Sequence, residues 1–266
     1  VMEKLIALMG TCSWQVNPIV KKDNPIPQIY YIGKGKSGSS SLWKGFDKTA
    51  VHWHTESHFE RLYKTKLLSE NNICLYDLVS YIGKKYDFKP LIIESYREPV
   101  SRILSNISQQ ARPIAKVRPP RVEIKNYTEF VKIARYHVAN GRCPYPYSIK
   151  WKEYFGVDLM NEFNRNEDYL FRELAYVKLL FLKLESADSW PKILKELGYN
   201  YLDNNANQSV KELPENLIEI YQEVLDHYQV PVETLKLMYD NQIVKTFYST
   251  KEIASFIERW GMEEWI

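Results

Sequence analysis

The sequence is poor in cysteine, and its few cysteines are far apart. Among 266 residues there are three, Cys12, Cys74 and Cys143. An odd number at these spacings fits neither a disulfide framework nor a zinc site. So few cysteines are typical of a reducing compartment, so we expect a cytoplasmic protein whose site holds no metal.

Long apolar runs and an excess of one charge are also absent from the sequence. No stretch approaches the roughly 18 apolar residues of a membrane span, and the run Leu5–Gly10 is too short for a signal-peptide core. The 36 Lys and Arg residues against 33 Asp and Glu residues leave a net charge of +3. This balance argues against a nucleic-acid partner but leaves room for a local anion site.

The composition that remains is that of an ordinary globular protein. Hydrophobic residues make up 45% and charged residues 26% of the chain. At about 100–200 residues per domain, we expect one large domain over residues 1–266. The sequence shows no internal repeat.

Strand-like and helix-like segments alternate, which predicts an α/β fold with a parallel sheet. Strands are expected over residues 28–32, 50–54, 90–95 and 179–186. Helices are expected over residues 39–46, 58–70, 75–86, 100–108 (with Pro99 in the first turn), 168–177 and 214–228. Ser249 and Glu252 form a capping-box pattern before a further helix, so the C-terminal part should be helical.

The segment Ile32–Leu42, I-G-K-G-K-S-G-S-S-S-L, follows a strand and opens a helix. Glycines allow a tight turn in which successive N–H groups face one concavity, and the helix N-terminus adds partial positive charge. Lys36 adds a full charge, and the three serines at 39–41 add hydroxyl donors. Because Ser39 rather than lysine follows Gly38, this is not a Walker A loop, and an ordinary ATPase or kinase is disfavoured.

A second candidate anion site follows the buried strand at 90–95, with the sequence R-E-P-V-S-R-I-L-S. In open parallel sheets, ligands gather at the carboxyl ends of strands, and Arg97 stands at such an end. Ser105 lies two turns along the following helix. Both side chains can reach one phosphate, with the guanidinium giving forked, charge-assisted bonds.

Together, these two segments resemble the PAPS-dependent sulfotransferases, whose sulfuryl donor PAPS is 3′-phosphoadenosine 5′-phosphosulfate. Two motifs carry the resemblance. The family's 5′-phosphosulfate loop, K-[SG]-G-[TS]-[TS], is similar to Lys36, Ser37, Gly38, Ser39 and Ser40. Its 3′-phosphate motif, R-[DE]-P-x-x-R-x-x-S, is similar to the run from Arg97 to Ser105. Weaker likeness, over residues 149–158 and 238–260, is to bacterial sulfotransferase-like proteins linked to capsular polysaccharide synthesis.

The resemblance implies a P-loop-like three-layer fold, with a central parallel sheet flanked by helices and a helical C-terminal part. It implies that residues 36–40, Ser41, Arg97 and Ser105 bind PAPS, with PAP as the product. Ser41 stands where many cytosolic members carry a tryptophan. The acceptor would be a hydroxyl or amine of a carbohydrate or small natural product. Two alternatives stay open, namely a small-molecule kinase with an unusual phosphate loop and a non-catalytic PAP-binding module.

A base for the acceptor proton is expected in Val51–Phe59, which holds three of the five histidines. His52 and His54 are two apart, so on a strand they share a face, and histidine suits base work near neutral pH. The segment is similar to the family's K-T-H strand, in which His54 would be the base and His52 would replace the lysine. Glu56 is the rival base, since Thr55–Phe59 is similar to the K-E-x-H-F-F segment of heparan-type members. Lys36 would stabilise charge on the leaving group.

Two further basic segments have two interpretations each. The first would close over an anionic acceptor or the nucleotide, or be a solvated loop; it contains Arg112, Lys116, Arg118, Arg121 and Lys125. The second would line the acceptor groove or begin a surface helix; it is Lys150, Trp151 and Lys152.

Overall fold

The computed structural model describes residues 1–11, 27–33, 41–42, 45–46, 50–53, 55–111, 122–140, 146–202 and 213–262. The chain divides into two compact units, one formed by Val1–Tyr96 with Pro146–Asn204 and the other by Arg97–Tyr145 with Asn205–Ile266. The single domain over residues 1–266 stays a prediction.

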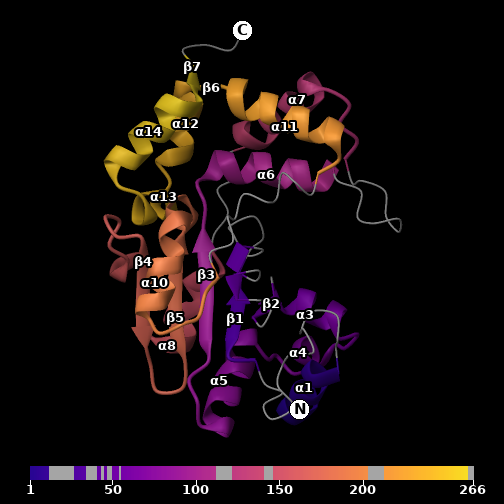
Figure 1. The fold of residues 1–266 in the computed structure, drawn as a ribbon, viewed down its shortest axis with the longest axis vertical. Helices are drawn as coiled ribbons and strands as arrows, with labels where there is room; N and C mark the ends of the chain where they lie inside the picture. Colours follow the sequence, from indigo (N-terminus) through magenta and orange to yellow (C-terminus); the bar gives the residue numbers. More distant parts are fainter. Residues whose placement is uncertain are drawn as a thin grey trace. The chain divides into compact units, whose positions relative to one another are not determined.

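The first unit is built on a five-stranded, mostly parallel sheet in the order β2-β1-β3-β5-β4 (Figure 1). Its strands are β1 (Ile29–Ile32), β2 (Val51–Trp53), β3 (Leu91–Tyr96), β4 (Tyr169–Glu173) and β5 (Lys178–Lys183). Neighbouring strands pair in parallel except β4, which runs antiparallel to β5. The predicted α/β class and the central parallel sheet are therefore confirmed, with one antiparallel edge strand.

Both faces of this sheet are covered by helical residues. Tyr31, Ile93 and Leu180 pair across β1, β3 and β5 and so share one face, where they form a core with Trp190 and Leu194. These two residues belong to α10 (Trp190–Glu196). Every residue of β3 is buried, as expected for a central strand of a parallel sheet.

Aromatic rings fill the opposite face of the same sheet. Trp53 of β2 meets Phe59 with ring centroids 5.0 Å apart, and Phe181 of β5 meets Trp151 at 6.4 Å. Phe59 lies in α3 (Glu56–Leu62) and Trp151 begins α8 (Trp151–Phe155). Further helical segments of this unit are α1 (Met2–Thr11), α4 (Leu67–Glu70), α5 (Leu75–Tyr86), η2 (Tyr147–Lys150), α9 (Leu159–Glu162) and η3 (Leu184–Ser189), and residues 41–42 and 45 are also helical.

Three predicted elements of this unit differ in the structure. The helix over 168–177 is wrong, since these residues form β4 and a turn closed by Leu174 N donating to Val177 O at 2.9 Å. The helix over 58–70 is broken between α3 and α4 at Lys64, whose φ of 50° is incompatible with a continuing helix. The strand over 179–186 ends at Lys183 and continues as η3. By contrast, α5 has the predicted bounds.

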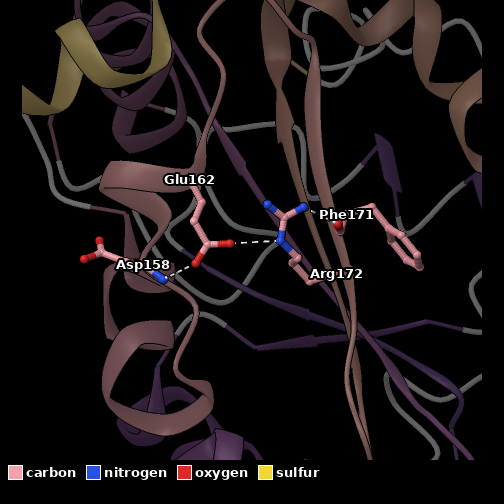
Figure 2. A network of polar contacts seen from close by, with 4 residues as sticks. All are labelled: Asp158, Glu162, Phe171 and Arg172. Carbon is pink, nitrogen blue, oxygen red and sulfur yellow. Dashed lines mark hydrogen bonds and ion pairs between the residues drawn. The ribbon is translucent and has the colours of Figure 1, made fainter.

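Polar contacts hold the edge strand β4 against α9 (Figure 2). Arg172 Nε donates to Glu162 Oε2 at 2.9 Å, and Glu162 Oε1 accepts from the backbone N–H of Asp158 at 2.8 Å. Arg172 also donates to the Phe171 carbonyl at 2.9 Å. The contact between Arg172 and Glu162 thus joins β4 to a helix that precedes it by only a few residues in the chain.

The second unit is helical, as predicted for the C-terminal part (Figure 1). It holds α6 (Pro99–Ala111), α7 (Tyr127–Ala139), α11 (Glu215–His227), α12 (Val232–Tyr239), α13 (Gln242–Phe247), α14 (Thr250–Trp260) and the short parallel pair β6 (Val230–Pro231) and β7 (Gly261–Met262). The predicted capping box of α14 is confirmed, because Ser249 Oγ accepts from Glu252 N at 3.2 Å and Ser249 N donates to Glu252 Oε2 at 2.7 Å. In the described part of the chain, no helix has the length and apolar character needed to cross a membrane.

Candidate functional site

The carboxyl ends of β1, β2, β3 and β5 meet at one edge of the sheet, because these strands are parallel. Gly33, which follows β1, donates from its N–H to the Trp53 carbonyl at the end of β2, at 3.1 Å. The predicted phosphate loop leaves the sheet directly after Gly33. Its residues Lys36, Ser37, Gly38, Ser39 and Ser40 lie outside the described residues.

Ser41, the last residue of the predicted loop, is described. It is partly exposed and helical, and its carbonyl accepts a hydrogen bond from Tyr201 Oη at 3.3 Å. The expected helix over 39–46 is seen here only at residues 41–42 and 45. Tyr201 thus anchors the start of this helical segment to the core of the same unit.

Gly33 is needed for the close approach of a buried carboxylate. A Cβ at this position would lie 2.7 Å from Glu94 Cγ, which is closer than real Cβ contacts allow. Glu94 lies on β3 and is only 1% exposed. The end of β1, just before the predicted phosphate loop, therefore packs directly on the Glu94 side chain, so a side chain at position 33 would displace either the strand end or Glu94.

The Glu94 carboxylate holds the start of η2 against the sheet. Its Oε1 accepts from the Tyr147 backbone N–H at 2.7 Å, and its Oε2 accepts from the Ser148 backbone N–H. Burying a carboxylate is costly unless it is hydrogen-bonded in this way. Glu94 thus fixes Tyr147 near the carboxyl ends of the parallel strands.

Tyr147 in turn holds Glu56, one of the predicted bases. The Tyr147 hydroxyl donates to Glu56 Oε1, which also accepts from Leu75 N at 3.5 Å. Burial raises the pKa of Glu56, but hydrogen bonds from Tyr147, its own backbone and Cys74, with the nearby charge of Lys150, outweigh burial and lower that pKa below its ordinary value. Glu56 is therefore an ionised hydrogen-bond acceptor at neutral pH.

Cys74 lies beside Glu56 and Tyr147 as a protonated thiol. Its Sγ is 3.8 Å from Tyr147 Oη. Burial, with a further contribution from Glu56, raises the pKa of the Cys74 thiol from 9.0 to about 11. At neutral pH the thiol is neutral, so it serves as a hydrogen-bonding neighbour of Glu56 rather than as a nucleophile.

We predict that Cys74 resists alkylation in the folded protein. At pH 8 its rise in pKa from 9.0 to about 11 lowers the thiolate fraction about 100-fold, since that fraction falls tenfold per pKa unit. Iodoacetamide labelling, followed on the Cys74 peptide by mass spectrometry, should be at least that much slower in buffer than in concentrated urea. Equal rates in both would contradict the raised pKa.

His52, another predicted base, lies in a different group of side chains. Its ring meets Tyr31 edge-on at 5.1 Å and His58 at 6.4 Å. The Tyr31 hydroxyl is 3.3 Å from Ser95 Oγ on β3. His54, the first predicted base, lies outside the described residues, so its position on the face of His52 stays a prediction.

The second predicted motif begins where β3 ends, and its residues belong to the second unit. Arg97 is half-buried, and Ser105 lies within α6 and is 6% exposed. Glu98 between them caps α6, since its carboxylate accepts from Val100 N at 2.7 Å and Ser101 N at 2.8 Å. Because Glu98 occupies these N–H groups, a phosphate at this motif would be held by side chains rather than by the helix N-terminus.

The acidic residue of this motif is itself held by a distant helix. The Tyr239 hydroxyl at the end of α12 donates to Glu98 Oε1. Glu98 is 1% and Tyr239 1% exposed. The residue next to Arg97 is thus fixed within the second unit by contacts that join α6 and α12.

The structure describes the two predicted basic segments to different extents. Of the first, only Lys125 is described; it is exposed and its Nζ is 3.5 Å from Glu123 Oε1. Arg112, Lys116, Arg118 and Arg121 lie outside the described residues. In the second, Trp151 is fully buried in the core, so the interpretation that it lines a groove is wrong.

The two lysines beside Trp151 contact different groups. Lys152 pairs with Asp158 at 2.6 Å on the surface, as expected for a surface helix. Lys150 Nζ lies 4.6 Å from the centroid of the Tyr147 ring. Lys150 therefore adds positive charge to the group of Glu56 and Tyr147.

Sequence reasoning missed Glu94, Tyr147 and Cys74. A signal for Glu94 was present, since a carboxylate inside the apolar run P-L-I-I-E-S needs partners when the strand is buried. Tyr147 and Cys74 carried no such signal, because their role depends on contacts across 73 to 91 positions of sequence.

In chemical terms, the carboxyl ends of the parallel strands carry three groups close to the start of the predicted phosphate loop. They are the ionised carboxylate of Glu56, the phenol donor of Tyr147 and the ammonium group of Lys150. Within the described ranges, no group of three or more His, Cys, Asp or Glu side chains is arranged to hold a metal ion. Comparison with known proteins gave no significant match to a family model, a curated protein or a solved structure.

Proposed function

We propose that this protein transfers a sulfuryl group from PAPS to a hydroxyl or amine of a carbohydrate or small natural product. One observation carries the proposal. The two segments that resemble the phosphate-binding motifs of sulfotransferases begin directly after β1 and β3, which are hydrogen-bonded parallel neighbours with Ile29 opposite Leu91 and Tyr31 opposite Ile93. In open parallel sheets, ligands gather at the carboxyl ends of neighbouring strands.

The chain's own residues supply the parts that such a transfer needs. Lys36 and the loop N–H groups would stabilise the charge that develops on the leaving phosphate. Arg97 and Ser105 would hold the 3′-phosphate, and the half-buried state of Arg97 is compatible with a charge-assisted contact. When bound, PAPS supplies the sulfuryl group and its phosphate is the leaving group, while the acceptor proton passes to a base of the protein.

The choice of base is influenced by the environment of Glu56. A carboxylate whose pKa is lowered by hydrogen bonds holds an accepted proton less well than an imidazole, whose ordinary pKa is near 6.5. This favours His54 as the base. Glu56 then acts as a fixed anion beside the reacting groups.

The class of reaction is tested by calorimetry with PAP and with ATP, each with and without magnesium. We expect PAP to bind without metal and more tightly than ATP. Tight binding of ATP only with magnesium would instead favour a small-molecule kinase. PAP binding with no sulfo transfer to any acceptor, followed as a mass gain of one sulfo group, would favour a non-catalytic PAP-binding module.

Replacing Arg97 with alanine should weaken PAP binding. A buried, hydrogen-bonded charge pair loses about 2–5 kcal/mol when one partner is removed. Because Arg97 is only half-buried, we expect the low end, about 2 kcal/mol or a roughly 30-fold rise in the Kd for PAP. The control is Lys132→Ala, an exposed cation on α7 of the same unit, and equal PAP affinity in both variants would refute the role of Arg97.

A further inference from the structure

Two hydrogen-bond donors converge on one oxygen of the Glu56 carboxylate. The Tyr147 hydroxyl and the Leu75 N–H both donate to Oε1. Neither of these donors uses Oε2. Since a carboxylate offers about four lone-pair positions, a donor group of a ligand can bind Oε2 while Tyr147 stays in place.

Tyr147 is itself held in position before any ligand arrives. Its backbone N–H donates to the buried Glu94, its ring centroid lies 5.3 Å from that of Tyr76 in a tilted arrangement, and Lys150 Nζ lies 4.6 Å from the Tyr147 ring centroid. The residue is 7% exposed. A hydroxyl fixed in this way orients its partner at little further cost in entropy on binding.

The surroundings of Glu56 also keep it charged. The titratable and charged groups that act on it or on its neighbour Cys74 come from η2, α5 and α8; they are Tyr147, Lys150, Cys74, Asp77 and Tyr154. Among them, the hydrogen bond from Tyr147 is the largest influence that lowers the pKa of Glu56. Loss of that hydroxyl should therefore raise the pKa of Glu56.

We infer that Tyr147 is a positioning residue for Glu56, holding one carboxylate oxygen so that the other accepts a hydrogen bond from a hydroxyl or amine of the acceptor that neighbours the reacting atom, while the proton of the reacting group itself passes to His54. The part played by the acceptor rests on the proposed function. Tyr147 touches neither donor nor acceptor in this scheme. An ionised Glu56 favours acceptors that present a hydrogen-bond donor next to the reacting atom and disfavours acceptors with an anionic group there.

The positioning is tested without any assay of activity. The full chain is labelled with glutamate carrying ¹³C in the side-chain carboxyl, and the Glu56 resonance is assigned with Glu56→Gln. In a pH titration, Tyr147→Phe should move the midpoint of Glu56 upward. The matched control is Tyr169→Phe, which removes a phenol hydroxyl from β4 in the same unit and should leave the midpoint unchanged.

The role in the acceptor step is tested by a double-mutant cycle with PAPS and an acceptor that is turned over. Tyr147→Phe should raise the acceptor KM about tenfold, the size expected for one hydrogen bond, with a smaller change in kcat. In the Glu56→Gln background the same substitution should have no further effect, because Tyr147 acts through Glu56. A purely structural role would lower activity equally in both backgrounds.

The outcomes separate this inference from the proposed function. An unchanged Glu56 midpoint in Tyr147→Phe overturns the inference, whatever the activity. A raised midpoint with no sulfo transfer supports the positioning of Glu56 and counts against the proposed function. A raised midpoint with additive effects in the cycle overturns the role of Tyr147 in the acceptor step.

Discussion

Replacing Lys36 with alanine should lower turnover with PAPS by about 10²–10³-fold, the size expected when one charged or hydrogen-bonding group that stabilises a transition state is removed. In a loose transition state the phosphate leaves with increasing negative charge, so positioning and charge stabilisation dominate the rate. An ammonium group in the loop acts most strongly at that stage. The effect should fall on kcat more than on the affinity for PAP.

The measurement is a steady-state assay of sulfo transfer by mass, with PAP affinity from calorimetry alongside it. Lys84→Ala is the matched control, since it removes an exposed lysine from α5 of the first unit, and it should turn over at the rate of the unaltered protein. Turnover within threefold of that rate in Lys36→Ala would remove the loop from the proposed mechanism.

Replacing Glu94 with alanine should cause a large loss of stability in the first unit. The backbone N–H groups of Tyr147 and Ser148 would lose their acceptor inside the protein. Each buried donor left without a partner costs about 1–3 kcal/mol, so the free energy of unfolding should fall by about 2–6 kcal/mol. The measurement is urea denaturation followed by fluorescence of the buried Trp53, Trp151 and Trp190.

Two further variants separate the causes of this loss. Glu94→Gln keeps the volume but offers one acceptor oxygen for two donors, so it should lose only part of the stability. Glu173→Ala removes a surface carboxylate that pairs with Lys89 at 2.7 Å and should cost at most about 1 kcal/mol. If Glu94→Ala cost no more than Glu173→Ala, Glu94 would not be the anchor of η2.

Local patterns were sufficient for elements whose signal lies within a few residues. The apolar run at 90–95 is β3, the helical spacing at 75–86 is α5, and the Ser249 and Glu252 pair caps α14. In each case the deciding contacts are between neighbours in sequence, or the strand is buried on both faces. Such elements can be predicted because their stabilising contacts are near in the chain.

Prediction failed where distant pairing decides the conformation. Residues 168–177 favour a helix locally, yet they form β4, because the register from Tyr169 opposite Leu182 to Glu173 opposite Lys178 satisfies their backbone groups on β5. The burial of Trp151 has the same origin, since its ring packs on Phe181 of β5. A helical pattern indicates an apolar face but does not say what covers it.

By itself, the sequence determined the alternation of strands and helices, the position of the two predicted phosphate-binding motifs after strands, and the choice of His54, Glu56 and His52 as candidate bases. Only the tertiary structure decided that β1 and β3 are neighbours and that Glu56 is held by Tyr147 and, through it, by Glu94. The physical reason is that a motif is a pattern of residues close together in the sequence, so it can be recognised without the fold. The charge and orientation of a side chain depend instead on groups that folding brings near it from 53 and 91 positions away.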